Sequence, residues 1–382
     1  AACGGRASVP RIRVVAASTP VSEEPGARQQ RLDAALVDVE KMVTERVTEL
    51  NFPGVAAAVL DRGRVIWLRS YGVADLQRRD PVTPRTVFRA GSITKTMTAM
   101  ATLVLREQGS LDLDVPAVKY LPELGQVGYP TADSPPITLR HLLTHTSGLP
   151  RLGRFNYAAE RDDAVSEAEV LGALRGLRLK HVPGIVNDYS NLGFSLVGLI
   201  LQRVTGDPLR QVLAETVLGP LNMSGARWEA SAVPANQLAT GYHWDGEAYV
   251  PRHHWKLGAS EAMGGLYATL DDLIRYTAFH MTAWPPGARA DAPPLKNAVL
   301  RESHLFGSFQ RPGNRGAGLG WGVVRLSNAK HVVFHTGATH QYASVVMFSP
   351  NGQTAFVAMA NTNRAFKPLD KLAGKVIQRL EP

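Results

Sequence analysis

The sequence has a single cysteine, Cys3, so no disulfide bond can form within its 382 residues. It has no long apolar run either: no stretch approaches the roughly 20 apolar residues that a membrane-spanning helix needs. It also has no internal repeat. The single cysteine excludes an internal disulfide framework, and the lack of a repeat excludes a repeat array. The lack of a long apolar run leaves no segment predicted to span a bilayer.

The sequence is also poor in the features of a nucleic-acid-binding surface. The formal net charge is +9, but the basic residues are dispersed along the chain. The densest groups, residues 6–13 and the pair Arg78-Arg79, contain no interleaved aromatic residues. We therefore expect a basic protein without a nucleic-acid partner, whose charge is compatible with attraction to an anionic envelope or substrate.

The first residues, Ala1-Ala2-Cys3-Gly4-Gly5, resemble the end of a bacterial lipoprotein signal, where lipid attaches to the cysteine. The hydrophobic part of such a signal is missing from the sequence, so an ordinary flexible N-terminus is an equal alternative. Residues 1–27 have few large apolar side chains and predict a flexible segment. We expect a bacterial periplasmic or cell-envelope location with Cys3 as the candidate lipid anchor, and a cytoplasmic location as the alternative.

Hydrophobic residues make up 45% of the chain, enough for a sizeable core. Apolar, β-branched runs on both sides of Asp61-Arg62-Gly63 predict a β-hairpin near the start. Near the other end, similar runs predict three more strands and a last helix. The elements expected at the two ends are a helix over 32–50, strands over 54–60, 64–70, 331–336, 342–348 and 354–360, and a helix over 367–380.

The middle of the sequence has helical periodicity. It predicts helices over 92–108, 139–145, 166–177, 192–205 and 208–218, and a capping box at Thr269 that opens a helix ending near Met281. The predicted fold class is α/β: an antiparallel sheet flanked by helices, built from 28–88 and 255–382, plus a mostly helical domain over 89–254. A cleft between two such parts is a common place for a binding site.

Ser92-Ile93-Thr94-Lys95 stands at the start of a predicted helix. Positions i and i+3 share a helix face, so the Lys95 amine can reach the Ser92 hydroxyl. A serine hydroxyl becomes a good nucleophile only when a base takes its proton. The lysine serves if it is partly deprotonated, or if its charge lowers the pKa of a neighbouring phenol. Alone, this spacing is more often a polar first helical turn.

Tyr189-Ser190-Asn191 precedes another predicted helix. Tyr189 could carry protons between Ser92, the leaving group and water, while Asn191 could bind the substrate's acyl amide or hold Lys95. The alternative is a helix cap beside a packed aromatic ring.

His335-Thr336-Gly337 ends a predicted strand. Gly337 would let a substrate approach the backbone, and the amide of Ala338 could join that of Ser92 as an oxyanion hole. The alternative is an ordinary turn at a strand end.

The three motifs together resemble the penicillin-recognising serine hydrolases: class C β-lactamases, D-Ala-D-Ala carboxypeptidases and esterases of the same β-lactamase/DD-peptidase-like fold. The resemblance runs over about 50–362 and includes further matching segments: His141-Leu142-Leu143-Thr144-His145-Thr146-Ser147-Gly148-Leu149, Gly219-Pro220-Leu221-Asn222-Met223 and Gly318-Leu319-Gly320-Trp321-Gly322. It implies Ser92 as nucleophile, Lys95 and Tyr189 as the base system, an oxyanion hole from the amides of Ser92 and Ala338, and His335, Thr336 and Gly337 as the substrate-facing strand.

The sequence departs from the class C β-lactamases at two places. His335 stands where those enzymes usually have the lysine of Lys-Thr-Gly, although some carboxypeptidases and D-peptidases of this fold have a histidine there. His340-Gln341-Tyr342 replaces a segment that tends to be glycine-rich. The resemblance therefore favours a carboxylesterase, for which we expect short esters to be hydrolysed faster than β-lactams. The alternatives are a D-Ala-D-Ala carboxypeptidase or β-lactamase, and a catalytically silent cell-wall or peptide-binding protein.

The sequence does not support two other kinds of catalytic site, an α/β-hydrolase site and a zinc site. No Gly-x-Ser-x-Gly is present, which leaves the nucleophile elbow of α/β-hydrolases unsupported. His141 and His145 have a zinc-like spacing but lack the glutamate of His-Glu-x-x-His, so we interpret them as structural. We expect no metal, no cofactor and a small ester, amide or β-lactam as the substrate.

Overall fold

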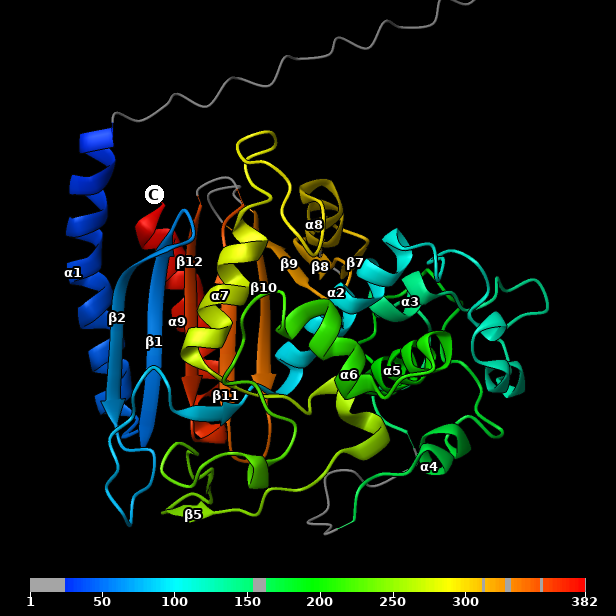
Figure 1. Cartoon of the computed structure of the whole chain (residues 1–382), viewed down its shortest axis with the longest axis horizontal. Coiled ribbons are helices and arrows are strands. Elements are labelled where there is room, and N and C mark those ends of the chain that lie inside the picture. Colours follow the sequence, from blue (N-terminus) through cyan, green and yellow to red (C-terminus); the bar gives the residue numbers. More distant parts are fainter. Residues whose placement is uncertain (1–24, 154–162, 311–312, 327–330, 351–352, 382) are drawn as a thin grey trace, which may run out of the picture.

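The computed structural model describes residues 25–381 except 154–162, 311–312, 327–330 and 351–352. Cys3 and most of the predicted flexible segment lie outside these residues. An eight-stranded antiparallel sheet is the centre of the described structure, with the strand order β2-β1-β12-β11-β10-β9-β8-β7 (Figure 1). Its strands are β1 Gly54–Asp61, β2 Arg64–Gly72, β7 Ser308–Gln310, β8 Arg315–Ala317, β9 Gly322–Arg325, β10 His331–Ala338, β11 Ala343–Phe348 and β12 Thr354–Ala360.

The sheet joins the two ends of the chain, as the sequence predicted. Val55 of β1 faces Ala360 of β12 in an antiparallel ladder. Four more short strands form two small ribbons, β3 with β6 and β4 with β5. Their bounds are β3 Val87–Arg89, β4 Tyr242–Trp244, β5 Tyr249–Pro251 and β6 Tyr267–Thr269.

Helices cover both faces of the sheet. In Figure 1, α9 lies behind the strands and α7 lies in front of them, while α1 stands beside β2. Alternate residues of β1 point to opposite layers, as a strand with period two requires. Val55, Ala57 and Val59 pack with α1 and α9, whereas Ala56 and Leu60 join the core on the other face. The helices are α1 Pro25–Glu49, α2 Thr94–Glu107, α3 Leu139–Leu143, α4 Glu167–Gly172, α5 Asn191–Thr205, α6 Leu209–Leu213, α7 Leu270–Met281, α8 Asn297–His304 and α9 Phe366–Leu380.

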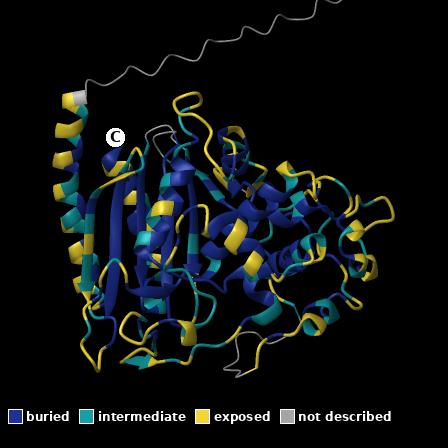
Figure 2. Ribbon diagram, in the orientation of Figure 1, coloured by how far each residue is buried: buried dark blue, intermediate teal, exposed yellow. Residues whose placement is uncertain are grey.

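The second hydrophobic core extends from the sheet into the helical region. It includes Ala58 of β1, Met97 of α2 and Leu199 of α5. Figure 2 shows buried residues continuing from the strands into these helices. The sheet and the helical region therefore hold each other in a fixed relation, which positions any site between them. Within the described residues, no helix combines the length and apolarity needed to cross a membrane.

Several predicted boundaries shift. α1 begins at Pro25 rather than 32, so the last residues of the predicted flexible segment are helical. The predicted helix over 208–218 ends as an α-helix at Leu213 and continues as a π-helical turn to Leu218. α8 and strands β7–β9 were not predicted, because they are short. The capping box at Thr269 is confirmed: its side chain accepts from the amide of Asp272 at 3.0 Å.

Two buried histidines connect α7 to α8. His280 Nδ1 and His304 Nε2 are 2.8 Å apart, and the Trp284 indole N–H donates to His304 Nδ1 at 3.0 Å. Since Nδ1 of His304 accepts, its proton lies on Nε2, which then donates to His280. Burial lowers the pKa of His280 to about 3 and holds that of His304 well below its usual value. Both rings are therefore neutral structural links.

Candidate active site

Ser92 lies on a short 3₁₀ turn, Gly91–Ile93, which leads directly into α2. The α-helix thus begins at Thr94, two residues later than predicted. Gly91 has a φ of +55°, in the left-handed region that favours glycine. A Cβ on Gly91 would also lie 3.0 Å from the amide nitrogen of Ala338. The absence of a side chain here lets the serine-bearing turn approach β10 closely.

Lys95 follows Ser92 by one turn and has no exposed surface. Its Nζ lies 3.1 Å from Ser92 Oγ and donates to the backbone carbonyl of Met263. Burial, and secondarily the positive charge of Arg151, holds the pKa of Lys95 well below its usual value of 10.5. An amine in this setting can be uncharged near neutral pH and accept a proton from the serine.

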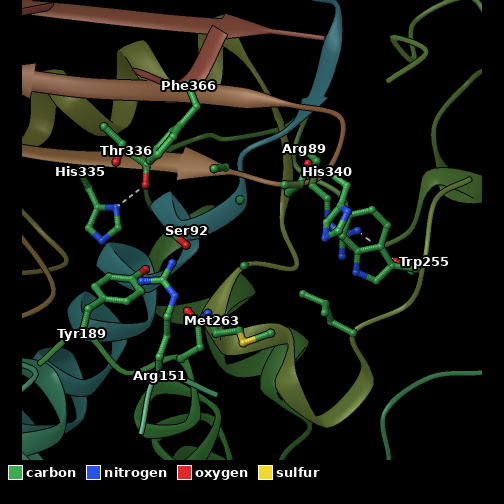
Figure 3. A pocket seen from close by; sticks show the side chains of 16 residues that line it. Arg89, Ser92, Arg151, Tyr189, Trp255, Met263, His335, Thr336, His340 and Phe366 are labelled. Carbon is green, nitrogen blue, oxygen red and sulfur yellow. Dashed lines mark hydrogen bonds between the residues drawn. The ribbon is translucent and has the colours of Figure 1, made fainter. Parts of the chain in front are cut away.

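The Tyr189 ring lies beside a lysine, an arginine and a histidine. Lys95 Nζ is 5.0 Å from the ring centroid, and Arg151 Cζ is 4.9 Å from it. The ring of His145 lies 4.3 Å away, centroid to centroid. In Figure 3, Ser92, Tyr189 and Arg151 lie close together at one end of the pocket. The structure thus brings the predicted nucleophile and both predicted proton-transfer groups into one place.

Local structure fixes the segment that carries Tyr189. Ser190 caps α5, because its Oγ accepts from the amide of Gly193 at 2.9 Å. The amide of Ser190 donates to His145 Nδ1 at 3.1 Å. Burial, with the charge of Lys95 second, holds the pKa of His145 well below its usual value, so the ring is a neutral acceptor. The helix cap and the histidine together set the direction of the tyrosine.

Strand β10 forms the opposite wall of the site. The amide of Thr339 donates to the backbone carbonyl oxygen of Tyr342, across the turn to β11, at 3.0 Å. Because bonded positions alternate along an antiparallel ladder, the amide of Ala338 points away from β11. On that side the pairing with β9 stops at Phe334. The amide of Ala338 is therefore aimed toward the Ser92 turn, as an oxyanion-hole donor requires.

Gly337 does not line the pocket as predicted. A Cβ there would lie 2.0 Å from the carbonyl oxygen of Ala90 and 2.2 Å from Ser344 Oγ. Its missing side chain makes room for the serine-bearing segment and not for a ligand. The Ser344 hydroxyl donates to Ala90 at 2.8 Å and strengthens the same contact. Gly337 therefore positions the site from behind.

His335 is buried beside Lys95 and Tyr189. Its Nδ1 lies 2.8 Å from the carbonyl oxygen of Thr336, an acceptor, so Nδ1 carries the proton. Burial, and then the charge of Lys95, lowers the pKa of His335 to about 3. The residue at this position is thus an uncharged imidazole at neutral pH.

The predicted residues surround one pocket of about 470 Å³ between β10 and the helical region (Figure 3). Its described lining contains Ser92, Tyr189, Asn191, His335, Thr336 and Ala338. Lys95 lies underneath, and Gly337 lies behind the wall. Other lining residues come from elsewhere in the chain and include Arg89, Arg151, Trp255, Met263, His340 and Phe366.

Sequence reasoning missed the two arginines and the Met263 carbonyl. Arg89 lies three residues before Ser92, on β3, and Arg151 follows the segment His145–Leu149 by two residues. Their proximity to the motifs was the available signal. A backbone carbonyl such as that of Met263 leaves no signal in the residue type.

The two histidines with zinc-like spacing have separate tasks. His141 Nδ1 accepts from the amide of Thr138 at 3.2 Å in the cap of α3, while His145 accepts from Ser190. Among the described residues, no three His, Cys, Asp or Glu side chains gather as a metal site would require.

Comparisons with known proteins agree with this geometry. The chain is 26% identical over 339 residues to "Protein flp" of Staphylococcus aureus (strain N315), covering 86% of this chain. It spans only 64% of the length of that relative. It is also 26% identical over 345 residues to "Putative penicillin-binding protein PbpX" of Bacillus subtilis (strain 168), covering 90% of this chain and 79% of that one.

A solved structure supports the fold. The octameric penicillin-binding protein homologue from Pyrococcus abyssi matches with a TM-score of 0.76 at 24% identity, over 90% of this chain and 77% of that chain. The model of the Beta-lactamase family matches residues 39–379. The chain therefore belongs to the beta-lactamase family, a group within a superfamily of serine hydrolases.

Proposed function

We propose that this protein hydrolyses small esters or amides through an acyl-enzyme on Ser92. The observation that carries the proposal is the buried Lys95 amine, 3.1 Å from Ser92 Oγ, whose pKa lies well below its usual value. A buried amine with a lowered pKa, beside a hydroxyl, is a base placed to activate a nucleophile. A structural lysine would instead pair with a carboxylate.

In the proposed reaction, Ser92 Oγ attacks the substrate carbonyl and its proton passes to Lys95 or Tyr189. The amides of Ser92 and Ala338 stabilise the negative charge on the carbonyl oxygen. Tyr189 and Lys95 then give the proton to the leaving alcohol or amine. A water molecule, deprotonated by the same pair, attacks the acyl-enzyme and releases Ser92. Asn191, in the pocket wall, is placed to orient the acyl group.

We favour a carboxylesterase over a β-lactamase. The neutral His335 leaves β10 without the fixed positive charge that a lysine would supply there. His340 is exposed at the pocket, and Gln341 and Tyr342 are buried behind it, so this segment is bulkier than a glycine-rich one. The second candidate is a D-Ala-D-Ala carboxypeptidase, favoured by the penicillin-binding names of the relatives.

A panel of three substrates tests the proposal: p-nitrophenyl butyrate, a chromogenic cephalosporin and a D-Ala-D-Ala peptide. We expect the highest kcat/KM for the ester, with no loss on EDTA treatment because the proposed proton transfers use only side chains. A cephalosporin value equal to or above the ester value would contradict the preference. Loss on EDTA that zinc restores would contradict the mechanism.

A fluorophosphonate probe tests the third alternative, a silent binding protein. We expect one covalent adduct, mapped to Ser92 by mass spectrometry. A protein that takes no label and turns over none of the three substrates would be a binder rather than an enzyme.

A further inference from the structure

The described lining of the active-site pocket contains two arginines and no aspartate or glutamate. A pocket with positive charge and no acidic side chain attracts an anionic ligand. The chain carries 33 acidic residues in all. Their absence from this lining is therefore a feature of the site and not of the composition.

Only one of the two arginines is available to a ligand. Arg89 is 2% exposed; its guanidinium lies 4.7 Å from the Trp255 ring and 5.2 Å from the Tyr267 ring. Its Nη1 donates to the Trp255 carbonyl at 3.1 Å. Arg151, in contrast, is exposed. Arg89 thus contributes a positive potential from within the wall, and Arg151 can make direct contact.

Arg151 is held at the catalytic centre. Its backbone carbonyl accepts from the amide of Asn191 at 2.8 Å, which ties it to the start of α5. Its guanidinium lies over the Tyr189 ring, beside Ser92 in Figure 3. No ion pair within the described part of the chain occupies this guanidinium. The stacking fixes the planar group, and no described residue forms an ion pair with its edge.

Arg151 does not take the place of the lysine that class C β-lactamases usually have at the position of His335 on β10. Arg151 belongs to the helical side, next to Tyr189 and Asn191, whereas His335 on β10 is uncharged. In Figure 3 Thr336 of β10 lies above Ser92 and Arg151 lies below it, while the His335 ring lies beside Tyr189. An anionic group of the substrate would therefore be directed toward the helical side of the nucleophile.

We propose that Arg151 binds a carboxylate of the substrate, so that the preferred substrates are esters or amides that carry a carboxylate directed toward the helical side. This inference rests on the proposed acyl transfer to Ser92 and specifies its substrate class. A guanidinium presents parallel N–H donors that match a carboxylate, and such charge-assisted bonds are about twice as strong as neutral ones. The partly enclosed pocket strengthens the attraction relative to bulk water.

Matched ester pairs test the proposal. The mono-p-nitrophenyl ester of adipic acid carries a carboxylate on the acyl side, and its methyl ester is the neutral partner with the same leaving group. The acetyl ester of a hydroxy-nitrobenzoic acid carries its carboxylate on the leaving group. The methyl ester of that carboxylate is its neutral partner. The readout is the ratio of kcat/KM, charged over neutral, with Ser92→Ala as the blank for spontaneous hydrolysis.

We expect the wild-type ratio to exceed 1 in at least one pair and to fall as salt is raised, because salt screens an exposed ion pair. Arg151→Gln should lower that ratio roughly 10-fold, between the small effect of losing an exposed ion pair and the larger effect of truncating one partner of a buried pair. Arg151→Lys should restore part of it. Arg85→Gln, an exposed arginine outside this pocket, should leave the ratio unchanged.

Two outcomes would overturn the inference: a wild-type ratio below 1 in both pairs, or an unchanged ratio in Arg151→Gln, whether neither ester loses activity or both lose it equally. The last result would mean that Arg151 acts through Tyr189, and a shifted pH–rate profile would accompany it. Failure of the proposed function is a different result, because the wild type would then hydrolyse neither ester and Ser92 would take no fluorophosphonate.

Discussion

At the residue scale, Ser92 is the side chain on which the proposed chemistry depends. Ser92→Ala should abolish turnover and fluorophosphonate labelling while it leaves the fold intact, because only one small hydroxyl is removed from a partly exposed position. Circular dichroism and thermal melting provide the control. Residual activity within about tenfold of wild type, a barrier change of only ~1.4 kcal/mol, would mean that the nucleophile lies elsewhere.

Lys95 and Tyr189 should behave as one unit. Lys95→Ala and Tyr189→Phe should each lower kcat roughly 10²–10⁴-fold, the usual effect of removing a general acid or base. The double variant should lose less than the product of the two losses, because both groups serve the same proton path. Independent, multiplicative losses in single-turnover kinetics would argue against a shared path.

The residue types of this site were predictable, but their electrostatics were not. Ser92, Lys95 and Tyr189 are recognisable from local spacing. The low pKa of His335 depends on its burial, and the charge of the pocket depends on Arg89 and Arg151. Burial and contacts between segments far apart in the chain cannot be read from a short motif.

At the element scale, the distance between β10 and the Ser92 turn is set by glycine. Gly337→Ala would place a Cβ 2.0 Å from the Ala90 carbonyl oxygen, so the strand or the turn must move. We expect a loss of about 1–3 kcal/mol of stability, the usual cost of overpacking, together with at least a tenfold loss of kcat. Gly374→Ala in α9, where a Cβ meets nothing within 4 Å, is the matched control and should be neutral or stabilising. Urea unfolding and ester kinetics on both variants provide the measurement.

The elements that the sequence predicted best have strong local signals. The hairpin β1–β2 has a tight turn at Asp61–Gly63, and α7 has a capping box, which the structure confirms. β7, β8 and α8 were missed because they contain three, three and eight residues, too few for a clear period. Their place at the edge of the sheet comes from tertiary packing.

At the scale of the whole molecule, buried histidines make stability depend on pH. Burial is the main cause that lowers the pKa of the four buried histidines His145, His280, His304 and His335, and of the half-buried His254. The unfolded chain binds protons on these rings below pH ~6.5. In the folded chain the pKa is about 4 for His254 and about 3 for His280 and His335, and it lies well below the usual value for His145 and His304. The free energy of unfolding should therefore fall as pH falls through this window, by up to about 1.4 kcal/mol per pH unit for each histidine.

Urea unfolding between pH 7 and 4 tests this acid sensitivity. His280→Phe should lower stability at pH 7, because the N–H of His304 loses its acceptor. It should also reduce the slope of the free energy of unfolding against pH by the equivalent of about one proton. A slope equal to that of the wild type in His280→Phe would show that this ring is already protonated in the folded state.

The pairing of β1 with β12 has a consequence for biosynthesis. Val55 faces Ala360, 305 positions later in the chain. At a translation rate of about 5–20 residues per second, the hairpin β1–β2 waits on the order of 15–60 s on the ribosome before its partner strand emerges. During this interval the apolar edge of β1 is open to wrong partners, the situation in which chaperones protect nascent chains. The wall that carries Ala338 can therefore take its final place beside Ser92 only after β12 has emerged.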